Sequence, residues 1–294
     1  MTEFVTTLIA APGNAAALEA ARAALADAVP GARTTWLGEH EAVDLAFEAA
    51  EAPDRSALGR LIDQLPVDLV VQPSAHRRKR LLVADMDSTM IAQECIDELA
   101  DLAGFKAEVA ALTERAMAGE IAFASALHER AALLAGLPLA TLAEVLETRI
   151  TTMPGARTLV ATMRANGAAA VLVSGGFTDF AEPVGRLLGF DKVRANRLLA
   201  GDGRLTGRVG EPVVDPDTKR ATLEEEATRL AVPPEGTLAV GDGANDIPMV
   251  EAAGLGIAFH AKPRLAAIAD ARIDHGDLTA LLYAQGYRRS DFVG

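Results

Sequence analysis

The sequence is poor in cysteine and in aromatic residues. Among its 294 residues it has one cysteine, one tryptophan and only 4% aromatic side chains. The lone Cys95 cannot form an intrachain disulfide, which excludes a disulfide-stapled domain and favours a reducing compartment. Its acidic neighbours favour a small buried hydrophobic residue over a reactive thiol, because a reactive cysteine needs electropositive surroundings.

Positive charge is also scarce. The chain has 28 lysines and arginines against 41 acidic residues, a formal net charge of −13. This balance disfavours nonspecific nucleic-acid binding, although a local cationic pocket for a small phosphate stays open. No apolar run approaches the length of a membrane span, and the start, MTEFVTTLIAAPG, lacks the features of a signal peptide. We therefore expect a cytoplasmic protein without a nucleic-acid or membrane partner.

Residues 1–75 predict a small separate domain. A strand from Val5 to Ala10 and a helix from about Ala15 to Ala28 precede the strands TTWLG and AVDLAFEA, a helix around Pro53–Leu65 and the strand DLVVQ. This βαββαβ order is that of a ferredoxin-like domain and resembles the ACT-type regulatory domain in topology alone. The basic run SAHRRKR follows, and we interpret residues 76–80 as a solvated linker because so acidic a chain disfavours an anion-binding role for it.

The stretch LLVADMDSTMI, Leu81 to Ile91, predicts a buried parallel strand that ends in Asp85 and Asp87. Open α/β sheets bind ligands at this edge. From about residue 93 to 151 the period is helical throughout, which predicts a helical cap inserted over the acidic pair. Strands and helices then alternate to about residue 290, which predicts an α/β fold with a doubly wound parallel sheet of Rossmann type.

Three later segments at predicted strand or helix ends carry polar residues suited to phosphate chemistry. Taken singly, the serine of the first is typical of a helix cap and the lysine of the second of a solvated surface. Together they predict an oxygen-ligand metal site that faces a phosphate cradle. The residues are Ser174, Gly175 and Gly176; Lys219; and Asp242, Asn245 and Asp246 in GDGAND.

Two other mechanisms lack the residues that they need. A serine nucleophile on an elbow requires G-x-S-x-G, but VSGG lacks the first glycine, and none of the five histidines falls within a motif. A Walker-type kinase requires G-x-x-x-x-G-K-[ST], which is absent. Chemistry through an aspartyl-phosphate remains.

The motifs DMDST, SGG, the lysine and GDGAND, in this order and with a helical insertion after the first, resemble the haloacid dehalogenase (HAD) superfamily of phosphohydrolases. Within it, ECIDELA and GEIAFASALHERAALL resemble the cap segments of the phosphoserine phosphatases. The resemblance implies hydrolysis of O-phospho-L-serine, the last step of serine biosynthesis. A phosphotransferase that passes the phosphoryl group to an amino-acid alcohol such as homoserine is the alternative, because it would share every catalytic residue.

The resemblance also implies roles for the acidic residues. Asp85 is similar to the family's nucleophile and Asp87 to its general acid and base. Mg²⁺ would lie between the Asp85 side chain, the Asp87 backbone carbonyl and Asp242. Asp246 would support these ligands from behind, with a helix-start acid as the alternative.

The remaining roles concern a small phosphorylated amino-acid substrate. From the residues alone, Glu94 and Arg130 are typical of surface charges on helices. The resemblance implies that they bind the two ends of the substrate. The βαββαβ order by itself suggests a further hypothesis, that the domain before the linker senses an amino acid such as serine and controls catalysis through dimerisation. The phosphoryl group would be held by Ser174, Gly175, Gly176 and Lys219 and oriented by Asn245, the ammonium by Glu94, the carboxylate by Arg130, and apolar parts of the cap pocket would be Met117 and Phe123.

Overall fold

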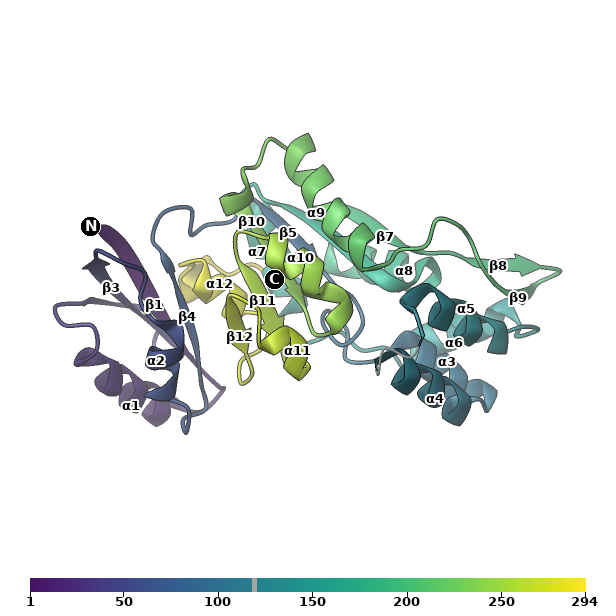
Figure 1. The fold of residues 1–294 in the computed structure, drawn as a ribbon, viewed down its shortest axis with the longest axis horizontal. Helices are drawn as coiled ribbons and strands as arrows, with labels where there is room; N and C mark the ends of the chain where they lie inside the picture. Colours follow the sequence, from purple (N-terminus) through teal and green to yellow (C-terminus); the bar gives the residue numbers. More distant parts are fainter. Residues whose placement is uncertain (118–120) are drawn as a thin grey trace.

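The computed structural model describes residues 1–117 and 121–294 (Figure 1). The N-terminal sheet lies at one end of the molecule, the α/β core in the middle, and a group of helices and a hairpin at the opposite end (Figure 1). The predicted fold class is confirmed: a parallel sheet carries a helical cap and follows a small βαββαβ domain. No helix in the described part of the chain is both long and apolar enough to cross a lipid bilayer.

The N-terminal sheet has four antiparallel strands in the order β2-β3-β1-β4. Two helices cover one face, where Leu18 of α1 packs against Leu8 of β1. Alternate residues of the same strands, such as Ile9 and Val70, point to the other face and join the main hydrophobic core. The elements are β1 (Thr2–Ala10), α1 (Ala15–Ala26), β2 (Arg33–Gly38), β3 (Ala42–Ala49), α2 (Arg55–Arg60) and β4 (Val67–Pro73).

Helix α2 is shorter than the predicted span of Pro53–Leu65. The Asp54 side chain caps its start by accepting from the Ala57 N–H at 3.0 Å. At its end, the Leu61 N–H bonds to the carbonyl three residues earlier, so a tighter turn replaces the α-helical pattern.

The core contains a six-stranded parallel sheet in the order β12-β11-β10-β5-β6-β7. Strand β5 lies in the middle, and the chain leaves it in one direction to form β6 and later returns on its other side to form β10. This reversal of strand order is where doubly wound sheets bind ligands. The elements are β5 (Leu81–Ala84), α7 (Ala156–Ala165), β6 (Ala169–Phe177), α8 (Thr178–Leu188), β7 (Lys192–Asn196), α9 (Pro216–Arg229), β10 (Thr237–Gly241), α10 (Ile247–Ala252), β11 (Gly256–Phe259), α11 (Pro263–Ala266), β12 (Ala271–Ile273) and α12 (Ala280–Ala284).

Strand β5 is buried on both faces, which explains its uninterrupted apolar sequence. Leu81 and Val83 belong to the hydrophobic cluster that also contains Leu223 of α9. Leu82 and Ala84 point the other way, into the cluster that holds α7 and α8. The first residue that leaves the sheet, Asp85, is therefore placed by hydrophobic packing on both sides of the strand that precedes it.

The cap is built from two separate segments of the chain. Helices α3 (Cys95–Ala103), α4 (Lys106–Met117), α5 (Phe123–Leu133) and α6 (Leu139–Thr148) lie within the predicted insertion. The hairpin of β8 (Leu198–Gly201) and β9 (Arg204–Val209), about fifty residues later, packs against α5 and bonds to the turn after it (Figure 1). The prediction of a cap at residues 93–151 missed this second segment, since nothing local in the sequence of a hairpin reveals its distant neighbour.

The chain enters and leaves the helical insertion through two paired segments. Ile91 and Thr152 form an antiparallel bridge, and the Met153 N–H donates to the Met90 carbonyl at 2.9 Å. The exit segment also rests on the core, where the Leu278 N–H donates to the Pro154 carbonyl at 3.1 Å. Both connections of the helical cap are thus held at one place, beside the loop that carries Asp85.

The interpretation of residues 76–80 as solvated is wrong for Arg77 and Lys79, whereas the other three residues of the run are exposed. The Arg77 guanidinium binds both oxygens of Asp44 in β3 at 2.6 and 2.7 Å, and its side chain is 15% exposed. It also donates to the carbonyls of Tyr283 and Ala284 in α12. Asp44 and these carbonyls need a donor once the two parts pack together, and Arg77 supplies it between them.

Two further basic residues of this run also have partners. Lys79 is buried, and its amine donates to the Glu235 carbonyl at 2.8 Å. The guanidinium of Arg78 lies 3.9 Å from the ring centroid of Tyr287. The basic run therefore attaches the N-terminal sheet to the core.

We expect Arg77→Met to weaken the attachment of the N-terminal sheet, because Asp44 would stay buried without its cation. The expected loss is about 2–4 kcal/mol in the free energy of unfolding. The chain's only tryptophan, Trp36, lies in β2, so its fluorescence during denaturant unfolding measures this sheet. Arg22→Met, on the exposed side of α1, is the control, and an equal midpoint for both variants would contradict the role of Arg77.

Candidate active site

Polar residues from three neighbouring strands meet at the carboxyl edge of the core sheet. Asp85 follows β5, Asp242 follows β10, and Ser174 lies near the end of β6. All three are buried, with Asp85 4% and Asp242 5% exposed. The tertiary structure thus brings together residues that are up to 157 positions apart in the sequence.

Three carboxylates form a compact group at this edge. One oxygen each of Asp85, Asp242 and Asp246 lies within 4.8 Å of the others. Among the described residues, no hydrogen-bond donor contacts Oδ2 of Asp85 or Oδ1 of Asp242. Clustered carboxylate oxygens are what a hard divalent cation requires, so this group fits a metal ion.

Asp246 differs from the other two because both of its oxygens already have protein partners. Oδ1 accepts from the Lys219 amine at 2.6 Å, and Oδ2 accepts from the N–H groups of Asp242 and Gly243 at 3.2 and 3.1 Å. A Cβ at Gly241 would lie 2.3 Å from the Asp246 carboxyl carbon, so only glycine fits there. Asp246 therefore shapes the loop that carries Asp242, which agrees with a supporting role.

The Lys219 amine is 1% exposed and lies between Asp85 and Asp246, at 2.7 and 2.6 Å. Its place on α9 is set by Asp215, which caps the helix through the Thr218 N–H, and by Pro216 at the first helical position. Burial alone would lower the pKa of Lys219, but the two carboxylates raise it above its ordinary value. A charged ammonium is thus held permanently beside Asp85.

Burial raises the pKa of Asp85 well above its ordinary value, and the charges of Asp246 and Asp242 raise it further, against the lowering effect of Lys219. Burial likewise raises the pKa of Asp242. The nearby lysines therefore do not fully offset the effect of burial on the pKa values of these two carboxylates. An added divalent cation would favour their ionised forms.

Asp87 lies where the core meets the cap. Its Oδ1 accepts from the Cys95 N–H at the start of α3, at 3.2 Å. Burial and the neighbouring Glu94 carboxylate raise the pKa of Asp87 to about 7. A carboxyl group with this pKa can both give and take a proton near neutral pH. The prediction for its backbone carbonyl as a metal ligand stays untested.

The predicted phosphate cradle lies beside Asp87. The Gly176 N–H donates to Ser174 Oγ at 2.8 Å. A Cβ at Gly176 would lie 2.7 Å from Asp87 Oδ2, and one at Gly175 would lie 3.1 Å from the Phe123 ring. Both glycines therefore allow close approach, the first of the acid and the second of the cap.

The cap supplies charged side chains over this edge. Ser88 Oγ donates to Glu94 Oε1 at 2.8 Å, which ties the start of α3 to the loop after β5. Burial lowers the pKa of Arg130 on α5, while the nearby charges of Glu94, Asp97 and Asp87 act to raise it. Since the Glu94 charge also raises the pKa of Asp87, both predicted substrate ligands, Glu94 and Arg130, lie in the neighbourhood of Asp87.

For two further predicted residues, Met117 and Asn245, the structure gives no contact among the described residues that bears on the predicted role. The side chain of Met117, at the end of α4, lies outside the described part of the structure. Asn245 is half-buried beside the acidic group, and a Cβ at Gly243 would lie 2.5 Å from its Oδ1. Its predicted role toward a phosphoryl group stays a prediction.

Sequence reasoning missed two residues of this site. Asn196, at the end of β7, donates to the Gly175 carbonyl at 2.8 Å and accepts from the Val214 N–H, so it fixes the cradle. Lys262, just after β11, places its amine 3.1 Å from Asp242 Oδ2, and Asp242 raises the pKa of Lys262 against the effect of burial. A polar residue at the end of a core strand or a few residues beyond it was the available signal for both.

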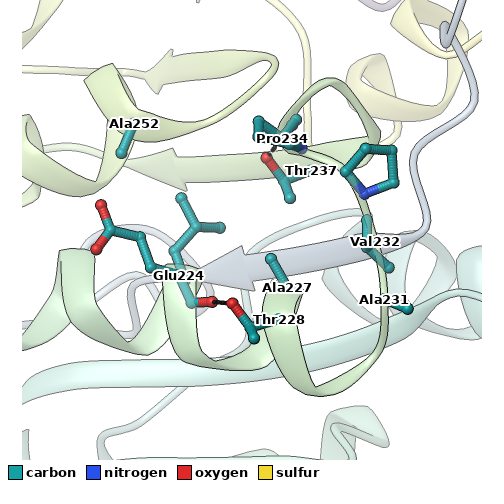
Figure 2. A pocket seen from close by; sticks show the side chains of 10 residues that line it. Glu224, Ala227, Thr228, Ala231, Val232, Pro234, Thr237 and Ala252 are labelled. Carbon is teal, nitrogen blue, oxygen red and sulfur yellow. Dashed lines mark hydrogen bonds between the residues drawn. The ribbon is translucent and has the colours of Figure 1, made fainter.

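A groove away from these carboxylates offers no comparable chemistry. It encloses about 470 Å³ along the later turns of α9, and Figure 2 shows Ala227, Val232 and Pro234 among its lining residues. Its hydroxyls are already bonded: Thr237 Oγ1 donates to the Pro234 carbonyl at 2.6 Å, and Thr228 Oγ1 donates to the Glu224 carbonyl at 2.8 Å (Figure 2). Among the described residues that line it, the one charged side chain, Glu224, is already paired with Arg220 at 2.8 Å.

Comparison with known proteins agrees with this geometry. A phosphoserine phosphatase of Mycobacterium tuberculosis is 46% identical over 241 residues, which are 81% of this chain and 59% of that protein. One from Archaeoglobus fulgidus is also 46% identical, over 80% of this chain and 68% of its own. The chain therefore spans less than two thirds of the mycobacterial relative.

Solved structures extend the likeness to the whole chain. A probable phosphoserine phosphatase from Vibrio cholerae is 33% identical, with a TM-score of 0.76, over 97% of this chain and 86% of that one. A phosphoserine phosphatase with a phospho-aspartyl intermediate analogue is 40% identical, with a TM-score of 0.66, over 70% and 98%. The profile of the haloacid dehalogenase-like hydrolases matches residues 82–251, so the chain belongs to that family.

Proposed function

We propose that this chain is a Mg²⁺-dependent phosphatase that hydrolyses O-phospho-L-serine to L-serine and phosphate, the last step of serine biosynthesis. One observation carries the proposal: a buried carboxylate, Asp85, has one oxygen held by Lys219, while its other oxygen has no donor among the described residues and lies under a cap that presents Glu94 and Arg130. The relatives named phosphoserine phosphatases support it.

The chemistry takes place in two steps. The Asp85 carboxylate attacks phosphorus, which forms the aspartyl-phosphate and breaks the bond to the serine oxygen, and Asp87 gives that oxygen its proton. A water then gives a proton to Asp87 and attacks phosphorus, which frees Asp85 and releases phosphate. One carboxyl group with a pKa of about 7 can serve as acid and then as base.

The phosphoryl group needs compensation for its negative charge. Ser174, the backbone of Gly175 and Gly176 and the Lys219 amine would hold its oxygens, with Asn245 orienting the group. The Gly176 N–H to Ser174 Oγ bond and the contact of Lys219 with Asp85 support this placement. Mg²⁺, bound by Asp85 and Asp242 with the Asp87 carbonyl, would reduce the repulsion between the phosphate and the attacking carboxylate. Asp246 would keep Asp242 in place.

The amino-acid end of the substrate would be bound by the cap. Glu94 is the partner for its ammonium and Arg130 for its carboxylate, because Arg can bind a planar carboxylate through two hydrogen bonds. Phe123 would close the apolar side above Gly175. The relatives compared here do not favour transfer of the phosphoryl group to homoserine, since they are named phosphatases.

The division into an N-terminal domain of residues 1–75, a connecting segment at 76–80 that attaches it to the core, and a catalytic part from 81 is also our proposal, as are a cytoplasmic location and a homodimer. The strand order β2-β3-β1-β4 supports a ferredoxin-like N-terminal domain.

Asp85→Asn is expected to reduce hydrolysis of phosphoserine by at least about a thousandfold, because an amide cannot act as the nucleophile. Lys219 keeps its bond to Asp246, so the thermal midpoint should change little. Steady-state release of phosphate measures the effect. Asp202→Asn, in the exposed turn between β8 and β9, is the control. Phosphate release near the wild-type rate from the Asp85 variant would rule out the mechanism.

Arg130→Ala should lower kcat/KM for phosphoserine about tenfold to a hundredfold, the effect of losing a charge-assisted hydrogen bond of about 1.5–3 kcal/mol. Phosphoethanolamine lacks the carboxylate, so its hydrolysis should be unaffected. Glu94→Gln should lower kcat/KM for both substrates, because both carry the ammonium. Equal losses on the two substrates for the Arg130 variant would contradict its role, and Arg186→Ala on α8 is the control.

The formation of the aspartyl-phosphate should slow as pH rises through about 7, because Asp87 must be protonated to donate to the serine oxygen. Rapid-quench measurement of the intermediate across pH tests this. Since the Glu94 charge helps to raise the pKa of Asp87, Glu94→Gln should move the decline to lower pH at saturating substrate. A decline that stays at the same pH in this variant would contradict the assignment.

A further inference from the structure

Lys262 holds the loop of Asp242 at two points. Its backbone N–H donates to the Asp242 carbonyl at 2.8 Å, and its amine lies 3.1 Å from Asp242 Oδ2. The amine also lies 3.8 Å from the position that a Cβ would take at Gly243. Lys262 thus places a positive charge on a carboxylate that the proposed function gives to the metal.

The two lysines of the site differ in their freedom to move. Lys219 is 1% exposed and bonds two carboxylates at once. The Lys262 side chain is 47% exposed, and among the described residues its amine bonds only Asp242. A flexible four-carbon stem at the rim can swing into solvent by breaking this one ion pair, whereas Lys219 cannot leave without uncovering two buried charges.

We propose that the Lys262 amine competes with the divalent cation for the Asp242 carboxylate. The inference rests on the proposed function, because it assigns a second role to a ligand of that metal. In this view the Lys262 amine orients Asp242 toward the site until the cation binds and displaces it. Two positive charges on one carboxylate repel each other, so the lysine weakens cation binding.

A lysine that only orients Asp242 predicts the opposite result. If orientation were its sole contribution, its removal would loosen the ligand and weaken cation binding. If it competes, its removal tightens cation binding. The direction of the change in affinity therefore distinguishes the two roles.

The test is Mg²⁺ titration of the full chain by calorimetry after treatment with a chelator. Lys262→Met and Lys262→Gln keep much of the stem without the charge, and we expect the Kd for Mg²⁺ to fall about threefold to tenfold in both. Lys262→Arg keeps the charge and should stay within about twofold of wild type. Lys106→Met is the control, because Lys106 is an exposed lysine that also bonds an aspartate, Asp101 in the cap.

Ionic strength gives a second readout. The difference between wild type and Lys262→Met should shrink as salt is raised, because the repulsion is partly screened at this exposed amine. Unchanged or weaker Mg²⁺ binding in both charge-removing variants would overturn the inference and leave the phosphatase proposal standing. A wild-type chain that binds no Mg²⁺ at all would overturn the proposed metal dependence, and the competition with it.

Discussion

The buried ammonium of Lys219 between Asp85 and Asp246 is the interaction on which the rest of the site depends. Without it, three carboxylates within 4.8 Å of one another would repel each other in a setting that already disfavours charge. With it, Asp246 is fixed as a support, and Asp85 keeps one oxygen without a donor in the described part of the chain. The helix cap at Asp215 and the packing of α9 on the sheet matter because they place this amine.

The cap completes what the sheet edge begins. The edge can bind a phosphate and a cation, but it holds nothing that distinguishes one phosphate ester from another. Glu94 and Arg130 come from the cap, and Phe123 closes against Gly175. Since both ends of the helical insertion are paired beside the loop after β5, a movement of the cap would carry Glu94 and Arg130, the proposed substrate ligands, relative to the fixed sheet edge.

The N-terminal sheet is attached to the core by polar contacts over an apolar interface. Arg77 joins Asp44 to α12, and Asp68 of β4 accepts from the N–H groups of Asp274, His275 and Gly276. Residues such as Ile9 and Val70 continue the main core across this boundary. The attachment therefore combines hydrophobic burial with satisfied buried charges, which favours one relative orientation of the two parts.

The sequence by itself determined the order of the elements, the βαββαβ start, the strand that ends in Asp85 and the motif residues at the sheet edge, because local hydrophobic period and turn chemistry encode them. Only the tertiary structure decided the rest. It joined the hairpin of β8 and β9 to the cap, turned the basic run into an attachment, and brought Asn196 and Lys262 to the site. Those outcomes depend on contacts between residues distant in sequence, and a short-range pattern carries no record of which distant partner a charged or polar side chain will meet.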